Sequence, residues 1–160
     1  MLILSSLFVI EEFAIKVVEG IRKNIRDKQV TPFGAMHTTG RAEDSLFYRI
    51  EENRLIIGST WAFITVLEDG RKPGKFAPPE VIEKWIDDKP VALRDISKKS
   101  LAFLINRSLK EKGSLIYQQG GHSGIISDYT NFEYVQKNLT EPLGKAVIDH
   151  VTSILFKIAA

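Results

Sequence analysis

The fold class follows from Ser45-Leu-Phe-Tyr-Arg-Ile-Glu-Glu-Asn-Arg-Leu-Ile-Ile-Gly-Ser59, a stretch with the two-residue period of β-strands. Its alternating apolar side chains are Leu46, Tyr48 and Ile50, then Leu55 and Ile57. The alternation predicts two strands, residues 45–51 and 54–59, each with one buried face. Between them lies Glu52-Asn53, and because asparagine tolerates a positive φ, we expect a two-residue hairpin turn.

Long amphipathic helices are predicted at both ends of the chain. Near the start, apolar residues recur at steps of three and four, which is the period of a helix over residues 5–26. These residues are Ile3, Leu7, Ile10, Ala14, Val17 and Ile21, with Phe13, Val18 and Ile25 beside them. A final helix carries Phe132, Val135, Leu139, Leu143, Val147, Val151, Ile154 and Ile158. Pro142 either kinks this helix or restarts it.

Three shorter helices are predicted between the hairpin and residue 113. The first covers residues 61–68 and ends at Gly70, and the second begins at Pro78-Pro79. The third runs from Ser97, as N-cap, to Gly113. For the second helix we expect an apolar face of Val81, Ile82, Trp85 and Ile86. For the third we expect Leu101, Leu104, Ile105 and Leu109 to point inward, with Phe103 also facing the core.

Two segments lack a regular period. Residues 71–79 hold three prolines and a glycine, which break both helices and strands. Residues 114–130 include Gln118-Gln-Gly-Gly-His-Ser-Gly124 and predict a mobile loop or an irregular hairpin. We therefore expect a single α+β domain over residues 1–160, with a long N-terminal helix, a small hairpin and several packed helices.

Composition narrows the function. The 22 basic and 20 acidic residues leave a formal charge of +2, whereas strong nucleic-acid binders usually carry a larger excess. The chain has no cysteine, which excludes a disulfide framework and a thiolate metal site. The apolar start runs into Glu11-Glu12 without a basic region or cleavage site, so we expect a buried helix and not a secretion signal or membrane span.

No catalytic, cofactor or metal site is expected. Gly70-Arg-Lys-Pro-Gly-Lys75 has one residue too few for a phosphate-binding loop, and Ser123 lacks the glycine spacing of a hydrolase nucleophile. Zinc ligation by His37, His122 and Asp128 would require folding to bring them together. A basic surface between residues 94 and 112, joined by Arg71, Lys72 and Lys75, leaves nucleic-acid binding as the alternative function.

A longer motif is more informative. Thr39-Gly-Arg41, Ser45-Leu46 and the hairpin come before Trp61-Ala-Phe63, which leads into Leu67-Glu-Asp-Gly-Arg71, Pro73-Gly-Lys-Phe76 and Pro78-Pro79. Ile82, Trp85 and Ile86 follow in the next predicted helix. With Ser100-Leu-Ala-Phe-Leu-Ile-Asn-Arg107 downstream, this order resembles the neck, or tail-completion, proteins of tailed bacteriophages. This chain has an extra alanine, Ala77, between Phe76 and the proline pair.

The resemblance implies a structural virion protein that forms a hexameric or dodecameric ring between head and tail and keeps the DNA channel continuous. Its expected partners are copies of itself, portal, neck or tail proteins and, nonspecifically, the DNA in the channel, without a membrane or cofactor. Assembly would take place in the host cytoplasm. Under this interpretation the expected contact residues are Arg71, Lys72, Pro73, Gly74, Lys75, Phe76, Tyr117, His122 and Tyr129.

Overall fold

The computed structural model describes residues 2–32, 39–52, 54–89 and 95–159, and it confirms the predicted α+β fold. Most of the chain is helical, and a two-stranded antiparallel sheet is formed by β1 (Leu46–Glu51) and β2 (Arg54–Ser59). The helices are α1 (Leu2–Asp27), α2 (Arg41–Asp44), α3 (Ile64–Asp69), α4 (Pro79–Asp88), α5 (Lys98–Lys112), α6 (Leu115–Gln118), α7 (Ser127–Thr130), α8 (Phe132–Val135) and α9 (Glu141–Ala159).

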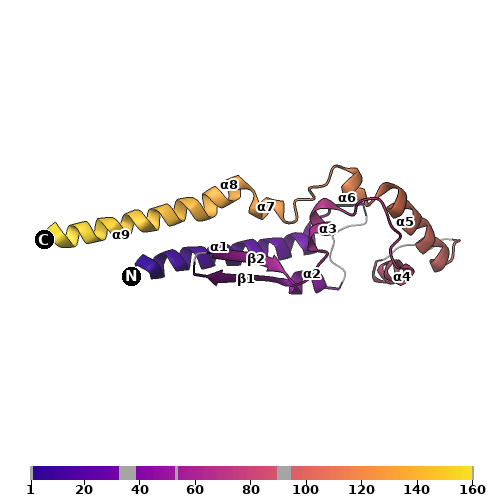
Figure 1. The fold of residues 1–160 in the computed structure, drawn as a ribbon, viewed down its shortest axis with the longest axis horizontal. Helices are drawn as coiled ribbons and strands as arrows, with labels where there is room; N and C mark the ends of the chain where they lie inside the picture. Colours follow the sequence, from indigo (N-terminus) through magenta and orange to yellow (C-terminus); the bar gives the residue numbers. More distant parts are fainter. Residues whose placement is uncertain (1, 33–38, 53, 90–94, 160) are drawn as a thin grey trace.

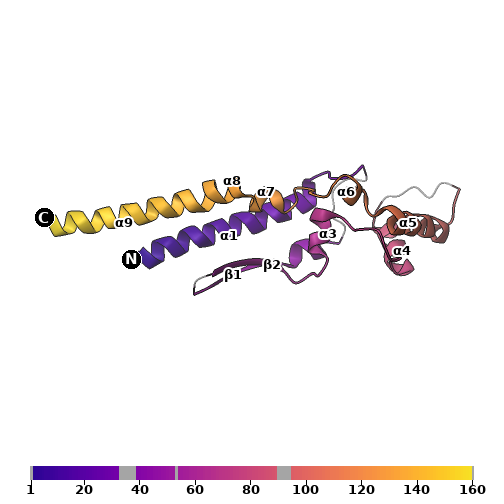
Figure 2. The same ribbon diagram turned by 45° about the horizontal axis from the view of Figure 1, so that its top comes forward.

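The main core forms along α1. Phe13, Val17, Ile21 and Ile25 follow one another at four-residue steps, so they share one face of the helix, and all four are buried. Leu46 of β1, Leu67 of α3 and Ile125 complete this cluster. The hairpin packs on α1 with the predicted face, since Tyr48, Leu55 and Ile57 contact the cluster. Figure 2 shows the hairpin and the C-terminal helices as layers on either side of α1.

The C-terminal helices form an antiparallel pair with α1 (Figure 1). Between α8 and α9 lies a π-helical turn, Gln136–Thr140, after which Pro142 occupies the first turn of α9. Val135, Gln136 and Glu141 keep right-handed helical backbone angles, so the helix continues through this region. Proline has no backbone N–H to donate to the preceding turn, and its ring crowds that turn. The wider π turn before Pro142 makes room for the ring, so the helix continues without the kink or break that proline otherwise causes.

A second, smaller core joins α4 to α5. Its buried members are Ala77, Ile82, Ile86 and Ala102. The predicted caps are present: the Ser97 hydroxyl accepts a hydrogen bond from the Ser100 N–H, and Gly113 ends α5 with a φ of 78°. This pair of helices lies at the end of the molecule opposite the two termini (Figure 1).

Three of the side chains that were expected to point inward from α4 and α5 are in fact exposed. Val81 of α4 and Leu104 of α5 are more than half exposed, and Phe103 is 58% exposed. The predictions for these residues are wrong because α4 and α5 pack mainly on each other. Each helix therefore needs only a narrow apolar stripe, and apolar residues outside that stripe face solvent.

The segment expected to form a mobile loop contains two short helices, α6 and α7. Residues 123–127 are tied to Glu68 of α3 by hydrogen bonds. Helix α7 reaches α1 at Gly20, where an added Cβ would overlap the Tyr129 ring. The predicted mobility of this segment stays a prediction.

Candidate functional site

The basic loop of residues 71–76 is fastened to α5 and to the chain that follows it. Arg71 donates its backbone N–H to the Ser114 hydroxyl, and the Ser114 N–H donates to the Arg71 carbonyl, both at 2.8 Å. In the middle of the loop, the Gly74 N–H donates to the Lys110 carbonyl at 2.9 Å. The Arg71 guanidinium also donates to the Lys75 carbonyl at 2.6 Å. The loop thus has irregular backbone but a defined shape.

An asparagine side chain fixes the end of this loop. Asn106 of α5 accepts the Ala77 N–H at 2.8 Å and donates to the Ala77 carbonyl at 2.7 Å. Asn106 is only 4% exposed, and Ala77 is buried with it. Because both backbone polar groups of Ala77 are satisfied in this way, the loop can run over the α4–α5 core without leaving these two groups unpaired.

Two aromatic rings and a lysine lie beside the fastened loop. The rings of Phe76 and Phe103 stack with centroids 6.4 Å apart, and Lys110 Nζ lies 4.6 Å from the centre of the Phe76 ring. Both phenylalanines remain about half exposed, Phe76 at 47%. A pair of large apolar side chains exposed at a cationic surface is the composition found at contacts with another macromolecule.

The charge of this surface is almost entirely positive. Residues 71–76 and 103–112 carry six cationic side chains and one carboxylate, Glu111. Arg107 pairs with Glu111 at 2.8 Å, which lowers the pKa of Glu111 and raises that of Arg107. We call the surface formed by Arg71, Lys72, Lys75, Phe76, Phe103 and Lys110 the basic-aromatic edge.

The other three expected contact residues lie in different places. Tyr117 is partly exposed beside the loop, since a Cβ added at Gly113 would meet both Tyr117 and Pro73. His122 is exposed, with a φ of 64°. Tyr129 packs between α1 and Tyr134, whose ring centre lies 5.2 Å away. The structure therefore brings the 71–76 residues and Tyr117 together and leaves His122 and Tyr129 elsewhere.

Glu68 organises the segment around His122. Its buried carboxylate accepts hydrogen bonds from the Ile126 N–H at 2.7 Å and the Ser127 hydroxyl at 2.5 Å, and also from Ser123 and Gly124. Burial is the largest single influence and raises the pKa of Glu68, but these donors together lower it below its usual value. The carboxylate acts as a charged anchor for the segment.

The pair formed by α1 and α9 exposes much apolar surface. We call residues 6–16 of α1 and 141–154 of α9 the helical arm. Its partly exposed apolar side chains include Leu7, Phe8, Ile15, Val147, Ile148, Val151 and Ile154. Phe8 is 67% exposed and Ile148 is 66% exposed. The sequence predicted an apolar stripe on these helices, but only the structure shows that part of it has no cover within the described chain.

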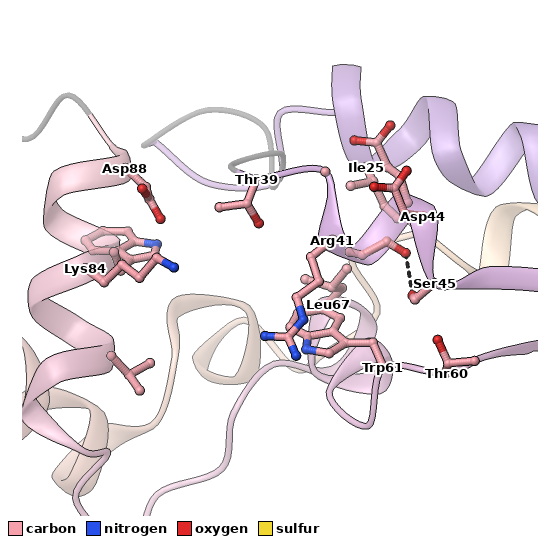
Figure 3. Close-up of a pocket in the computed structure, with 15 residues that line it drawn as sticks. Ile25, Thr39, Arg41, Asp44, Ser45, Thr60, Trp61, Leu67, Lys84 and Asp88 are labelled. Carbon is pink, nitrogen blue, oxygen red and sulfur yellow. Dashed lines mark hydrogen bonds between the residues drawn. The ribbon is translucent and has the colours of Figure 1, made fainter.

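A cleft of about 790 Å³ separates α4 from α2 and Trp61 (Figure 3). One wall carries Lys84 and Asp88 of α4, and the other carries Asp44 and Arg41, of which Arg41 lies beside the Trp61 ring. The charges are mixed, and they select no class of ligand. Among the described residues no three His, Asp or Glu side chains could together hold a metal ion. His37, one of the expected zinc ligands, lies outside the described residues.

Comparison of the chain with known protein families, curated proteins and solved structures gives no match. No helix within the described residues is long and apolar enough to cross a membrane.

Proposed function

We propose that this chain is a structural protein of the head–tail neck of a tailed bacteriophage, where it completes the tail or connects it to the head. It assembles with copies of itself into a ring that keeps the DNA channel continuous. The resemblance in the Trp61–Ile86 motif supports this proposal, together with the features of the molecule that follow.

The observation that carries the proposal is the uncovered apolar surface of the helical arm. Isolated exposed apolar residues are normal in monomers, but here they recur on two adjacent helices at one end of an elongated molecule (Figure 1). A partner that covers Phe8, Ile148 and Val151 would remove this surface from water. A ring protein has such a partner in the neighbouring copy.

Light scattering after size-exclusion chromatography tests self-assembly, with negative-stain images of the same fractions. We expect rings of six or twelve copies with a central hole. The double variant Ile148→Ser/Val151→Ser should stay folded, because both residues are exposed, and should form fewer rings. As a control, Thr65→Ser at an exposed position of α3 should assemble normally. A chain that stays a monomer of 18.1 kDa at every concentration and gives no cross-linked species would contradict the proposal.

The cations of the basic-aromatic edge favour a second candidate function, a small nucleic-acid-binding module. Lys72, Lys75 and Lys110 are exposed and have no ion-pair partner among the residues that the structure describes. Phosphate contacts release counterions, so binding of DNA through this surface would weaken steeply with salt. Fluorescence anisotropy with a labelled duplex at two salt concentrations separates this function from ring assembly.

A further inference from the structure

The two surfaces without cover lie at opposite ends of the molecule. In Figure 1 the helical arm occupies the end that holds both termini, and α4 and α5 occupy the other. Figure 2 shows the same separation from a second direction. Since one chain cannot bring its own two ends together, any contact between these surfaces joins one copy to another.

The two surfaces differ in charge. In the helical arm, the described acidic residues are Glu11, Glu12, Glu141 and Asp149, against Lys16 and Lys145. Lys16 pairs with Glu12 at 2.7 Å, so these two charges cancel. The other charged groups named here are three carboxylates and one ammonium group, so the net charge is negative. The arm is therefore acidic as well as apolar, and the basic-aromatic edge is cationic as well as apolar.

The aromatic pair distinguishes a protein partner from duplex DNA at the basic-aromatic edge. The phosphate backbone would pair with Lys72 and Lys75 but would leave Phe76 and Phe103 exposed to water. A protein surface with both carboxylates and apolar side chains matches the whole edge. Its phenylalanines then form the buried centre of the contact and its lysines the polar rim.

Charge also decides which surfaces meet. Two basic-aromatic edges facing each other would place like charges together, and two arms would do the same. Contact between the edge of one copy and the arm of the next pairs opposite charges and buries apolar groups from both. Such a head-to-tail contact uses two different surfaces, and when its rotation closes it produces a ring.

We infer that the basic-aromatic edge of each copy docks on the helical arm of the next copy. This inference rests on the proposed ring assembly and names the surfaces that build it. Fastening of the loop by Ser114, Lys110 and Asn106 holds the edge in its binding shape before contact, which reduces the entropy lost on docking.

Cysteine cross-linking tests the pairing directly, because the chain has no cysteine of its own. One preparation carries Pro73→Cys in the loop, and the other carries Thr152→Cys, one turn after Ile148 in α9. Both positions are exposed, and both changes retain the lysines and phenylalanines of the edge and the apolar residues of the arm. Oxidation of the mixture should give a dimer linked between positions 73 and 152. A control mixture of Thr65→Cys with Thr152→Cys should give little.

Charge exchange supplies a second measurement. Lys72→Glu/Lys75→Glu and Glu141→Lys/Asp149→Lys should each weaken assembly about tenfold, and a mixture of the two variants should restore 73–152 cross-linking. Lys23→Glu/Lys99→Glu makes the same change in net charge as Lys72→Glu/Lys75→Glu, but outside both surfaces, and should assemble normally.

Three results would overturn the inference while ring assembly stands: rings linked mainly between like positions, rings that the charge variants do not affect, or a Lys72→Glu/Lys75→Glu chain that assembles normally but no longer binds DNA. The last result would assign the edge to DNA. Absence of both oligomers and cross-links from every preparation would instead reject the proposed function along with this contact.

Discussion

Replacement of Asn106 by alanine is the most informative single test of how the basic-aromatic edge is built. The change removes the acceptor of the Ala77 N–H and the donor to the Ala77 carbonyl, at 2.8 and 2.7 Å. Each buried backbone group left without a partner costs about 1–3 kcal/mol. Since both groups belong to one residue at the margin of a small core, where water can partly replace the lost bonds, we expect a total loss of about 2–4 kcal/mol.

Chemical denaturation followed by circular dichroism measures this loss. In thermal unfolding, the same loss should lower the melting temperature of a domain of this size by roughly 5–15 °C. Hydrogen exchange at the Ala77 amide should become faster, because its acceptor is gone. Arg107→Ala is the matched control on the next position of α5, since that side chain is exposed and pairs only with Glu111. Its cost should stay below about 1 kcal/mol.

A loss for Asn106→Ala no larger than that for Arg107→Ala would refute the reasoning, since water would then replace both bonds fully. Unchanged exchange at Ala77 would refute it independently of global stability, because the local bond would not protect that amide.

Four further predictions concern the core, the exposed apolar surface of the helical arm, the contact between α1 and α7, and pH. Ile25→Ala should lower the free energy of unfolding by about 2–5 kcal/mol, measured by urea denaturation, because Ile25 is buried. Ile148→Ala should leave the stability of the monomer almost unchanged and reduce assembly, measured by light scattering. Gly20→Ala should cost about 1–3 kcal/mol because its Cβ would overlap the Tyr129 ring, and Tyr129→Ala should remove most of that added cost in the double variant. The pKa of Glu68 is lowered by folding, so its stabilising contribution is complete above its ordinary pKa and is lost as the pH falls through the folded value. Denaturation across acidic pH should therefore show a shallower loss of stability for Glu68→Gln than for the unchanged chain.

Opposite results would be equally specific. Equal losses for Ile25→Ala and Ile148→Ala would contradict the assignment of one to the core and the other to the surface. If the stability losses of Gly20→Ala and Tyr129→Ala simply added in the double variant, the Cβ at position 20 would not be repelled by the Tyr129 ring. A Glu68→Gln chain with unchanged acid dependence would assign that dependence to other carboxylates.

Periodic patterns predicted the regular elements well. The apolar residues at steps of three and four in α1 and the alternation on either side of Glu52 involve only residues close in sequence, so a short stretch of sequence is enough to predict each element. The caps at Ser97 and Gly113 are local for the same reason. These signals were enough for the α+β class and for the order of its elements.

The remaining features depend on residues far apart in sequence. Glu68 accepts hydrogen bonds from a segment more than 50 residues away, and no local pattern marks it as the anchor of that segment. Asn106 is a polar residue at an inward position of α5, where the pattern suggested only apolar packing. Phe103 was expected to face the core, yet it is exposed because the rest of the chain covers only a narrow part of α5.

The paired hydrogen bonds between Arg71 and Ser114 have a consequence for how the molecule can vary. They hold Arg71 and Ser114, which flank the segment containing α4 and α5, in direct contact at 2.8 Å, so the chain enters and leaves this segment at adjacent points. Insertions whose two junctions are adjacent can be shortened, lengthened or exchanged without redirecting the chain on either side. A different segment could therefore replace residues 72–113 between Arg71 and Ser114 and present another contact surface, while the buried cluster along α1 stays unchanged.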